Sequence, residues 1–240
     1  MNKLVPTLRS LLFYAVYGLS LIIHSMLCAL FVWMLPLKQR YPIVVMWNHF
    51  VIWWVGVSCG VKFRIMGEHN IPDAPYLMVS NHQSPWETIF LYSRFKPLCA
   101  VLKIELLRIP FFGWAIALLR PIGIDRSKRR EARQTLMGQG LQRLNEEKLS
   151  VLIFPESTRV PHGEFKNFSN GAAELAIAAG VKIVPLYHNA GLFWPAKQLL
   201  KRPGVIDVVI GTAIDTSGRE ARELTQQLQQ FIHEGIARLP

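Results

Sequence analysis

An uncharged, apolar stretch near the N-terminus constrains this chain more than any other feature. The 28 residues between Arg9 and Lys38 carry no formal charge, and residues 11–35 are almost wholly apolar. As a helix rising about 1.5 Å per residue, the stretch is long enough to cross a hydrocarbon core of about 30 Å. A secretory signal peptide is the competing interpretation, but its apolar region spans about 7–15 residues and ends at a small-residue cleavage site. The stretch is therefore predicted to associate with a membrane.

A second uncharged block follows at residues 41–61 and contains three of the seven tryptophans. Tryptophan prefers the headgroup level of a bilayer, where its ring is buried and its N–H remains hydrated. Lys38 and Arg40, in the connection, oppose translocation of that loop because basic residues are retained on the cytoplasmic side. Two arrangements remain open: a helix pair that dips into the cytoplasmic leaflet, or one span followed by an interfacial helix. Residues 1–60 are predicted to form this membrane-associating segment.

The overall charge favours an anionic partner. There are 27 Lys and Arg against 16 Asp and Glu, a net charge of +11, and the 51% hydrophobic fraction excludes a disordered chain. No acidic residue precedes Glu68, so positive charge is concentrated beside the hydrophobic segment, which favours lipid; no nucleic-acid-binding motif is present. The three cysteines cannot all pair and show no metal-binding spacing, which indicates a reducing compartment.

From residue 61 onward the pattern is globular. Short apolar runs alternate with segments of helical periodicity, which is typical of an α/β fold with a mostly parallel sheet flanked by helices. Residues 61–240 are therefore predicted to form one α/β domain. The apolar runs are residues 76–80, 98–102, 151–154, 183–186 and 205–210, and the helical segments are residues 128–148, 172–179 and 219–238.

Polar residues follow these apolar runs, where open α/β sheets collect their chemistry. After residues 76–80 comes His82, followed by Ser84-Pro85-Trp86-Glu87, which has the form of a helix start with Ser84 as N-cap. Glu87 is then explained by a capping box alone. The alternative is that the chain folds back so that the Glu87 carboxylate holds one ring nitrogen of His82 and leaves the other as a general base.

Several motifs in a fixed order resemble the glycerolipid acyltransferase family, which includes bacterial 1-acyl-glycerol-3-phosphate acyltransferases. The resemblance covers residues 82–185. It rests on Asn-His-x4-acid at residues 81–87, Ile-Asp-Arg at 124–126, Phe-Pro-Glu-x-Thr-Arg at 154–159 and an apolar run that ends in Val-Pro at 185.

The resemblance implies a role for each matching residue. His82 is the general base on the acceptor hydroxyl and Glu87 is its orienting partner, with no covalent enzyme intermediate. The remaining implied substrate-binding residues lie around a phosphate site: Glu156, Ser157, Thr158 and Arg159 from the Phe-Pro-Glu block, Asp125 and Arg126 from the preceding motif, Lys103 with Glu105 after another apolar run, and Lys166.

Two positions depart from the family pattern. Glu87 stands where the family usually has Asp, and the extra methylene is expected to be absorbed by a small shift of the turn. Ser157 stands where the family has Gly; if that position needs a positive φ, Ser is strained, and if not, its hydroxyl adds a phosphate donor.

The implied reaction moves a fatty acyl chain from an acyl carrier protein or coenzyme A thioester to the sn-2 hydroxyl of 1-acyl-glycerol-3-phosphate, giving phosphatidic acid. The expected location is the bacterial cytoplasmic membrane with the catalytic domain on the cytoplasmic side; no cofactor, metal or nucleic acid is expected. Other acceptors stay open, namely another lysophospholipid, an ornithine lipid or a lipid A precursor. So does a membrane-anchored protein that only binds anionic lipids.

Three further features of the sequence have competing interpretations. A serine hydrolase using Ser84 or Ser157 is disfavoured because the chain has no Gly-x-Ser-x-Gly elbow. His188 either reaches the cleft or serves as a structural hydrogen-bonding residue. The basic run at residues 126–133 either forms a solvated or membrane-facing surface or docks an acidic carrier protein.

Overall fold

The computed structural model describes residues 4–240 and contains one mixed sheet in the order β1-β7-β6-β2-β5-β3-β4. Neighbouring strands are parallel except for β6 and β7, which run antiparallel. The predicted α/β class is therefore confirmed. The strands are β1 (Val61–Met66), β2 (Leu77–Ser80), β3 (Leu98–Lys103), β4 (Ile122–Ile124), β5 (Ser150–Ile153), β6 (Ile183–His188) and β7 (Gly204–Ile210).

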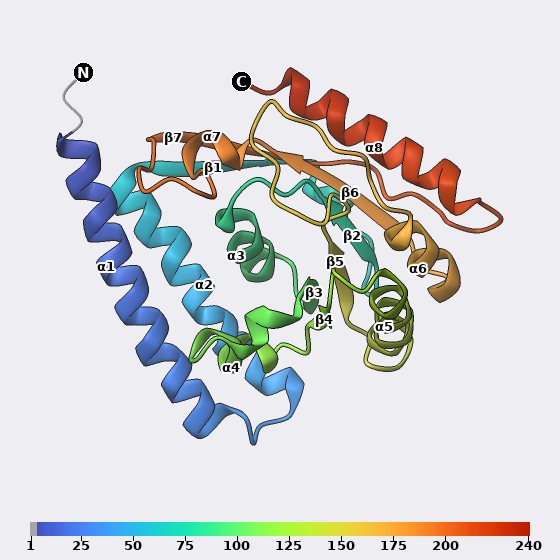
Figure 1. Ribbon diagram of the computed structural model, residues 1–240, viewed down its shortest axis with the longest axis horizontal. Coiled ribbons are helices and arrows are strands. Elements are labelled where there is room, and N and C mark those ends of the chain that lie inside the picture. The colour runs from blue at the N-terminus through green and yellow to red at the C-terminus, as the bar shows by residue number, and fades with distance from the viewer. Residues whose placement is uncertain (1–3) are drawn as a thin grey trace.

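Helices cover both faces of the sheet (Figure 1). One face carries α1 (Leu4–Leu27), α2 (Leu37–Cys59) and α3 (Pro85–Arg94), with the short α4 (Phe112–Ala117) and α7 (Ala190–Phe193) at its margins; the other carries α5 (Arg129–Leu141), α6 (Gly171–Ala179) and α8 (Ala221–Arg238). Single turns complete the chain: η1 (Cys28–Val32), η2 (Glu68–Asn70), η3 (Ile104–Arg108) and η4 (Gln142–Glu146).

The topology decides which loops meet. Strand β2 lies between β5 and β6 and is parallel to both, so the loops that follow these three strands leave the sheet at the same edge. All three had been predicted as strands that end in polar residues. Strand β1 was not predicted, because Lys62 and Arg64 interrupt its apolar pattern; it forms an edge of the sheet where such side chains remain in solvent.

Helices α1 and α2 share the hydrophobic core of the domain. The Phe13 ring packs edge-on against Trp194, with centroids 4.9 Å apart. The Tyr41 hydroxyl donates to the Leu98 carbonyl and accepts from the Leu98 amide, both at 2.9 Å, which ties α2 to β3. The inner faces of both helices are thus buried against the sheet layer.

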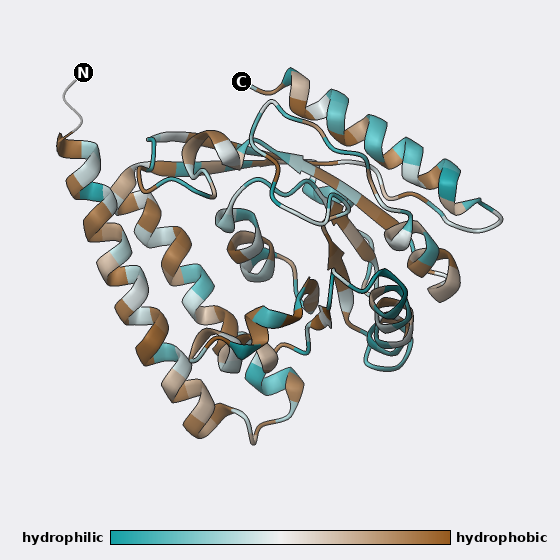
Figure 2. Ribbon diagram, in the orientation of Figure 1, coloured by the Kyte–Doolittle hydropathy of each residue, from teal (hydrophilic) through white to brown (hydrophobic). Residues whose placement is uncertain are grey.

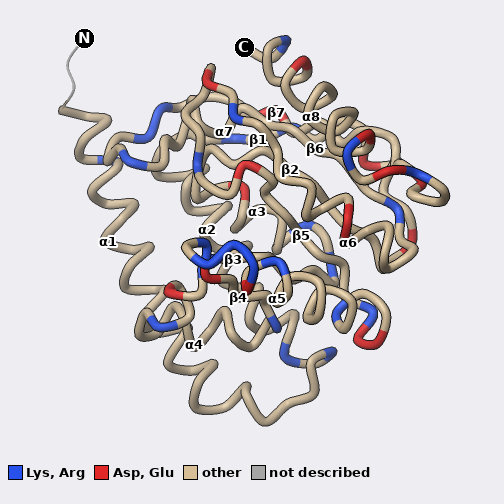
Figure 3. Tube along the Cα trace, turned by 45° about the vertical axis from the view of Figure 1, so that its right-hand side comes forward, with Lys and Arg blue, Asp and Glu red and all other residues tan. Residues whose placement is uncertain are grey.

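The outer face of these helices is apolar and exposed. Both helical segments, Leu4–Val32 and Leu37–Cys59, are long and apolar enough to cross a membrane. Figure 2 shows brown, hydrophobic residues along α1, in contrast to the largely hydrophilic outer side of α8, and Figure 3 shows that α1 is nearly without charge. This surface supports association with a membrane. Among its exposed residues are Leu8, Leu12, Leu19, Ile23, Phe31 and Trp53.

Candidate active site

The start of α3 builds the site from a local hydrogen-bond pattern. Ser84 is the N-cap and accepts from the Trp86 amide at 3.0 Å, while Pro85 occupies the first helical turn. Glu87 reaches back to accept from the Ser84 amide at 2.9 Å, which completes the predicted capping box. This pattern fixes the Glu87 carboxylate at the end of β2 rather than along the helix.

The same carboxylate also holds His82. Glu87 Oε1 lies 2.7 Å from His82 Nδ1 and accepts from the Gln83 amide at 3.0 Å. Capping and imidazole contact therefore coexist. Glu87 is fully buried; burial opposes its ionisation, but the hydrogen bonds from His82 and the Ser84 amide, with the favourable electrostatic effect of the His188 and His82 rings, outweigh that cost and lower its pKa. An ionised Glu87 keeps the proton on Nδ1 and leaves Nε2 as a proton acceptor.

Phe154 and Glu156, from the loop after β5, fix His82 from two further directions. The Phe154 ring stacks on the imidazole with centroids 4.1 Å apart and an interplanar angle of 20°. Glu156 Oε2 accepts from the His82 backbone amide at 2.7 Å. The family resemblance implied a place for Glu156 at the phosphate and no role for Phe154, whereas in the structure both residues contact His82.

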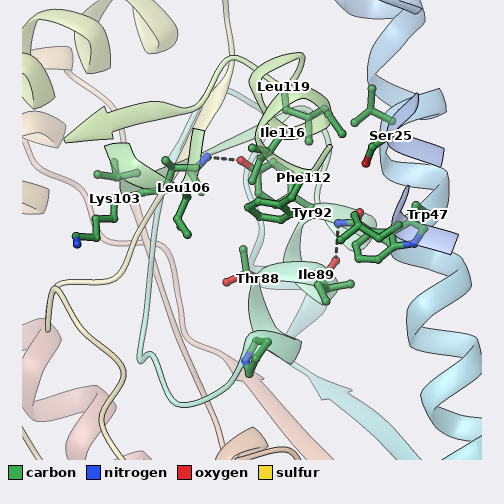
Figure 4. Close-up of a pocket in the computed structure, with 18 of the residues that line it drawn as sticks. Ser25, Trp47, Thr88, Ile89, Tyr92, Lys103, Leu106, Phe112, Ile116 and Leu119 are labelled. Atoms are coloured by element: carbon green, nitrogen blue, oxygen red, sulfur yellow. Dashed lines mark hydrogen bonds between the residues drawn. The ribbon is translucent and has the colours of Figure 1, made fainter. Parts of the chain in front are cut away.

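A cavity of about 180 Å³ begins at His82 and runs between α3, α4 and the N-terminal helices. Its lining is mainly apolar, and its cationic residues are Lys103, Arg126 and Arg159. Figure 4 shows how it is enclosed by side chains from four parts of the chain: Ser25 and Trp47 from α1 and α2; Thr88, Ile89 and Tyr92 from α3; Lys103 and Leu106 from β3 and η3; and Phe112, Ile116 and Leu119 from α4 and the turn after it.

Of the other predicted phosphate residues, Lys103, Arg126 and Arg159 line this cavity, whereas Asp125, Ser157, Thr158 and Lys166 do not. Arg126 donates to the Ser157 carbonyl, which joins two of the predicted motifs. Asp125 accepts from the Ser127 amide at 3.0 Å and its hydroxyl at 2.7 Å, and so shapes its own turn. Lys103 pairs with Glu105 at 3.0 Å. Thr158 is exposed beside Arg159, and Lys166 is exposed further along the loop.

The comparisons with known proteins agree with this geometry. The Acyltransferase family model matches residues 62–189. The 1-acyl-sn-glycerol-3-phosphate acyltransferase of Pseudomonas aeruginosa is 43% identical over 239 residues, covering 98% of this chain and 93% of that protein. The chain belongs to the 1-acyl-sn-glycerol-3-phosphate acyltransferase family. Its yeast relative of the same name, from Saccharomyces cerevisiae, is 38% identical over 145 residues, which are 55% of this chain and 48% of the yeast protein.

A solved structure of the family shares the fold. The crystal structure of the 1-acyl-sn-glycerophosphate acyltransferase PlsC from Thermotoga maritima matches with a TM-score of 0.79 at 21% identity, covering 99% of this chain and 97% of that one. The match includes the N-terminal helices, because it extends over nearly the whole chain. The resemblance inferred from four short motifs is thus confirmed at the level of family and fold.

His188 serves a structural role in this acyltransferase. Its Nδ1 accepts from the Ala190 amide at 3.2 Å, so Nε2 carries the proton and donates to the Asn81 carbonyl at 3.1 Å. The Asn81 side chain binds the backbone N–H and C=O of His188, both at 3.0 Å. His188 thus ties β6 to the residue before His82. Within residues 4–240, no group of three or more His, Cys, Asp or Glu side chains is arranged to hold a metal ion.

Ser157 of this acyltransferase occupies the left-handed region, with φ 59°. A side chain there costs about 1–2 kcal/mol, so the strained alternative applies. We expect Ser157→Gly to raise the free energy of unfolding by about 0.5–1 kcal/mol, since the greater freedom of Gly in the unfolded chain offsets part of the relief. Ser169→Gly, at an exposed residue without positive φ, is the control and should destabilise instead. Denaturant titration of both variants in detergent tests this; equal effects would contradict it.

Glu156 of this acyltransferase gives the fold a pH dependence. Burial raises the pKa of Glu156 to about 8, with the Glu87 charge adding to the effect. Between pH 5 and 8 the folded protein therefore keeps a proton that the unfolded chain releases, and stability falls as pH rises, by up to about 1.4 kcal/mol per pH unit. Glu156→Gln keeps an acceptor for the His82 amide but does not titrate. The difference in unfolding free energy between wild type and variant should change with pH; parallel curves would show that Glu156 is ionised throughout.

Proposed function

We propose that this enzyme transfers a fatty acyl chain from a thioester to the sn-2 hydroxyl of 1-acyl-sn-glycerol-3-phosphate, producing phosphatidic acid. The observation that carries the proposal is the His82–Glu87 pair, 2.7 Å apart, in an apolar cavity that Arg126 and Arg159 also line. The relative from Pseudomonas aeruginosa, which is similar along almost the whole chain, carries this activity in its name.

The proposed mechanism uses the free Nε2 of His82. Nε2 removes the proton of the acceptor hydroxyl as its oxygen attacks the thioester carbonyl, and the ionised Glu87 stabilises the imidazolium that forms. The tetrahedral intermediate then collapses: the C–S bond breaks, and the leaving thiolate takes the proton from Nε2. No covalent bond to the enzyme is needed, and His82 returns to its starting state. Phe154 and Glu156 keep the imidazole aligned through both steps.

The apolar and the cationic residues that line the cavity suit different parts of the substrates. The apolar walls suit an acyl chain, because each buried methylene contributes about 0.8 kcal/mol. Arg126 and Arg159 suit the phosphate of the acceptor, since guanidinium groups offer paired donors in a fixed plane. We assign Lys103 and Thr158 to the same phosphate site and Asp125 and Ser157 to its framework.

The enzyme is proposed to lie on one leaflet of the cytoplasmic membrane, with its catalytic domain on the cytoplasmic side. Residues 1–60, of which residues 4–60 are described, supply the membrane surface, and residues 61–240 form the acyltransferase domain. Helices α1 and α2 pack against that domain at Phe13, Ser25 and Tyr41, which lie along much of their length. A spanning hairpin would remove these contacts from the domain, so the structure favours insertion of the outer apolar face alone.

The test is acyl transfer by the purified full-length protein in mixed micelles. Labelled acyl-coenzyme A and acyl-carrier protein are each supplied with 1-acyl-glycerol-3-phosphate, and phosphatidic acid is measured for wild type and His82→Ala. We expect turnover by the wild type that is lost in the variant. Parallel reactions contain another lysophospholipid, an ornithine lipid precursor or a lipid A precursor as the acceptor. Turnover only with one of these would replace the proposed acceptor, and equal activity of His82→Ala would overturn the mechanism.

A further inference from the structure

A second cavity, of about 310 Å³, is lined by Gln83, the neighbour of His82 in the chain, and is not used by the mechanism above. It is formed where the loop after β5 meets the segment that follows β6. Residues from both segments line it, together with the residue that follows His82. Those relevant to its chemistry are Gln83, Arg159, His162, Gly191, Lys197 and Arg202.

The lining of this second cavity is cationic. Arg159, Lys197 and Arg202 contribute three positive charges, and no Asp or Glu lines the cavity. Across the described part of the chain, none of these three side chains forms an ion pair or a hydrogen bond with another residue, whereas Arg64, Arg120, Arg133 and Arg219 are all paired with carboxylates. His162 adds a buried ring nitrogen, Nδ1, without a partner. Unpaired donors that converge on one cavity suit an anionic ligand.

Gln83 and Gly191 are closely packed in the lining of the second cavity. The Gly191 amide donates to Gln83 Oε1 at 3.2 Å, which joins the start of α7 to the residue after His82. A Cβ at Gly191 would lie 3.0 Å from the Gln83 side chain, so a larger residue here would require Gln83 to shift. The two cavities share Arg159, and Gln83 of the second directly follows His82 of the first.

The acyl donor carries an apolar group at one end and an anionic group further along, which matches the apolar and the cationic cavity. In both acyl-coenzyme A and acyl-carrier protein, an apolar chain is joined through the thioester to a pantetheine arm, and that arm ends in a phosphate. Arg126 and Arg159, which line the apolar cavity, are already assigned to the acceptor phosphate. We propose that the second cavity binds the phosphopantetheine arm of the acyl donor, with Lys197 and Arg202 contacting its phosphate. This inference rests on the proposed function, because it assumes a thioester donor.

The experiment compares two minimal donors that carry the same acyl chain, acyl-pantetheine and acyl-4′-phosphopantetheine. For the wild type we expect a kcat/KM about tenfold higher with the phosphorylated donor, as for charge-assisted hydrogen bonds at a partly exposed site. Lys197→Gln/Arg202→Gln should bring the ratio close to one, with KM for 1-acyl-glycerol-3-phosphate unchanged. The control, Lys182→Gln/Arg222→Gln, removes the same charge from exposed positions that line neither cavity and should keep the ratio.

Complete donors distinguish the possible sources of the phosphate. The Lys197/Arg202 double variant should lose about tenfold in kcat/KM with both acyl-coenzyme A and acyl-carrier protein, because beyond the acyl thioester the two donors share only this arm. A loss with coenzyme A alone would assign the cations to the nucleotide phosphates and overturn the proposal. A wild-type ratio near one, or a raised KM for the acceptor, would also overturn it. Absence of transfer from every donor in the wild type would instead be the failure of the proposed function.

Discussion

Glu87→Gln is expected to lower kcat about 10³-fold, within the range that general acid–base catalysis contributes. Glu87 Oε1 accepts from His82 Nδ1 and from two backbone amides. A glutamine oxygen can replace these hydrogen bonds, but the neutral amide cannot stabilise the imidazolium formed during transfer. Because the capping box is kept, the fold should change little. Saturating acyl-transfer kinetics measure the loss, and far-ultraviolet circular dichroism checks the helices.

Two variants separate charge from geometry at this position. His82→Ala removes the base itself, and its kcat should fall at least as far as that of Glu87→Gln. Glu87→Asp keeps the charge with a shorter reach and should retain more activity than Glu87→Gln, since the turn before α3 can move to absorb one methylene. Glu164→Gln, at an exposed loop residue, is the matched control. A loss below tenfold for Glu87→Gln would leave Glu87 as a helix cap only.

Ala115→Phe is expected to change the preference for acyl-chain length about 10²-fold toward shorter chains. Ala115 is buried on α4 and lines the apolar cavity. A benzyl group there occupies the space of about four methylenes of the acyl chain. Burial of each methylene contributes about 0.8 kcal/mol to binding. The ratio of kcat/KM between long and short acyl donors, measured with one acceptor, gives the effect. Ala117→Phe, on the exposed side of the same helix, should leave the ratio unchanged.

The outcome also tests which side of His82 holds the acyl chain. An unchanged ratio in Ala115→Phe, in a protein that still folds and turns over, would remove the acyl chain from this cavity. A uniform loss with all chain lengths would indicate that the phenyl group disturbs α3 instead, and thermal unfolding would then show a lower Tm. Only a length-dependent loss supports the assignment.

Local relations were readable from the sequence because they depend on residues close together along the chain. Ser84, Pro85 and Glu87 predicted the start of α3, and the capping box is present as expected. The apolar runs predicted five of the seven strands because burial on both faces requires continuous apolar residues. The uncharged segment before Lys38 predicted a membrane-associating helix because a long apolar composition leaves few alternatives.

The tertiary structure alone decided how distant residues combine. Strand β2 lies between β5 and β6, and this order brings Phe154 to the His82 ring, Glu156 to the His82 amide and His188 to Asn81; no spacing within the chain encodes it. The left-handed backbone at Ser157 likewise follows from the loop around it. Both cavities are walled by residues more than a hundred positions apart, because packing between layers sets their shape, so only the folded chain shows them.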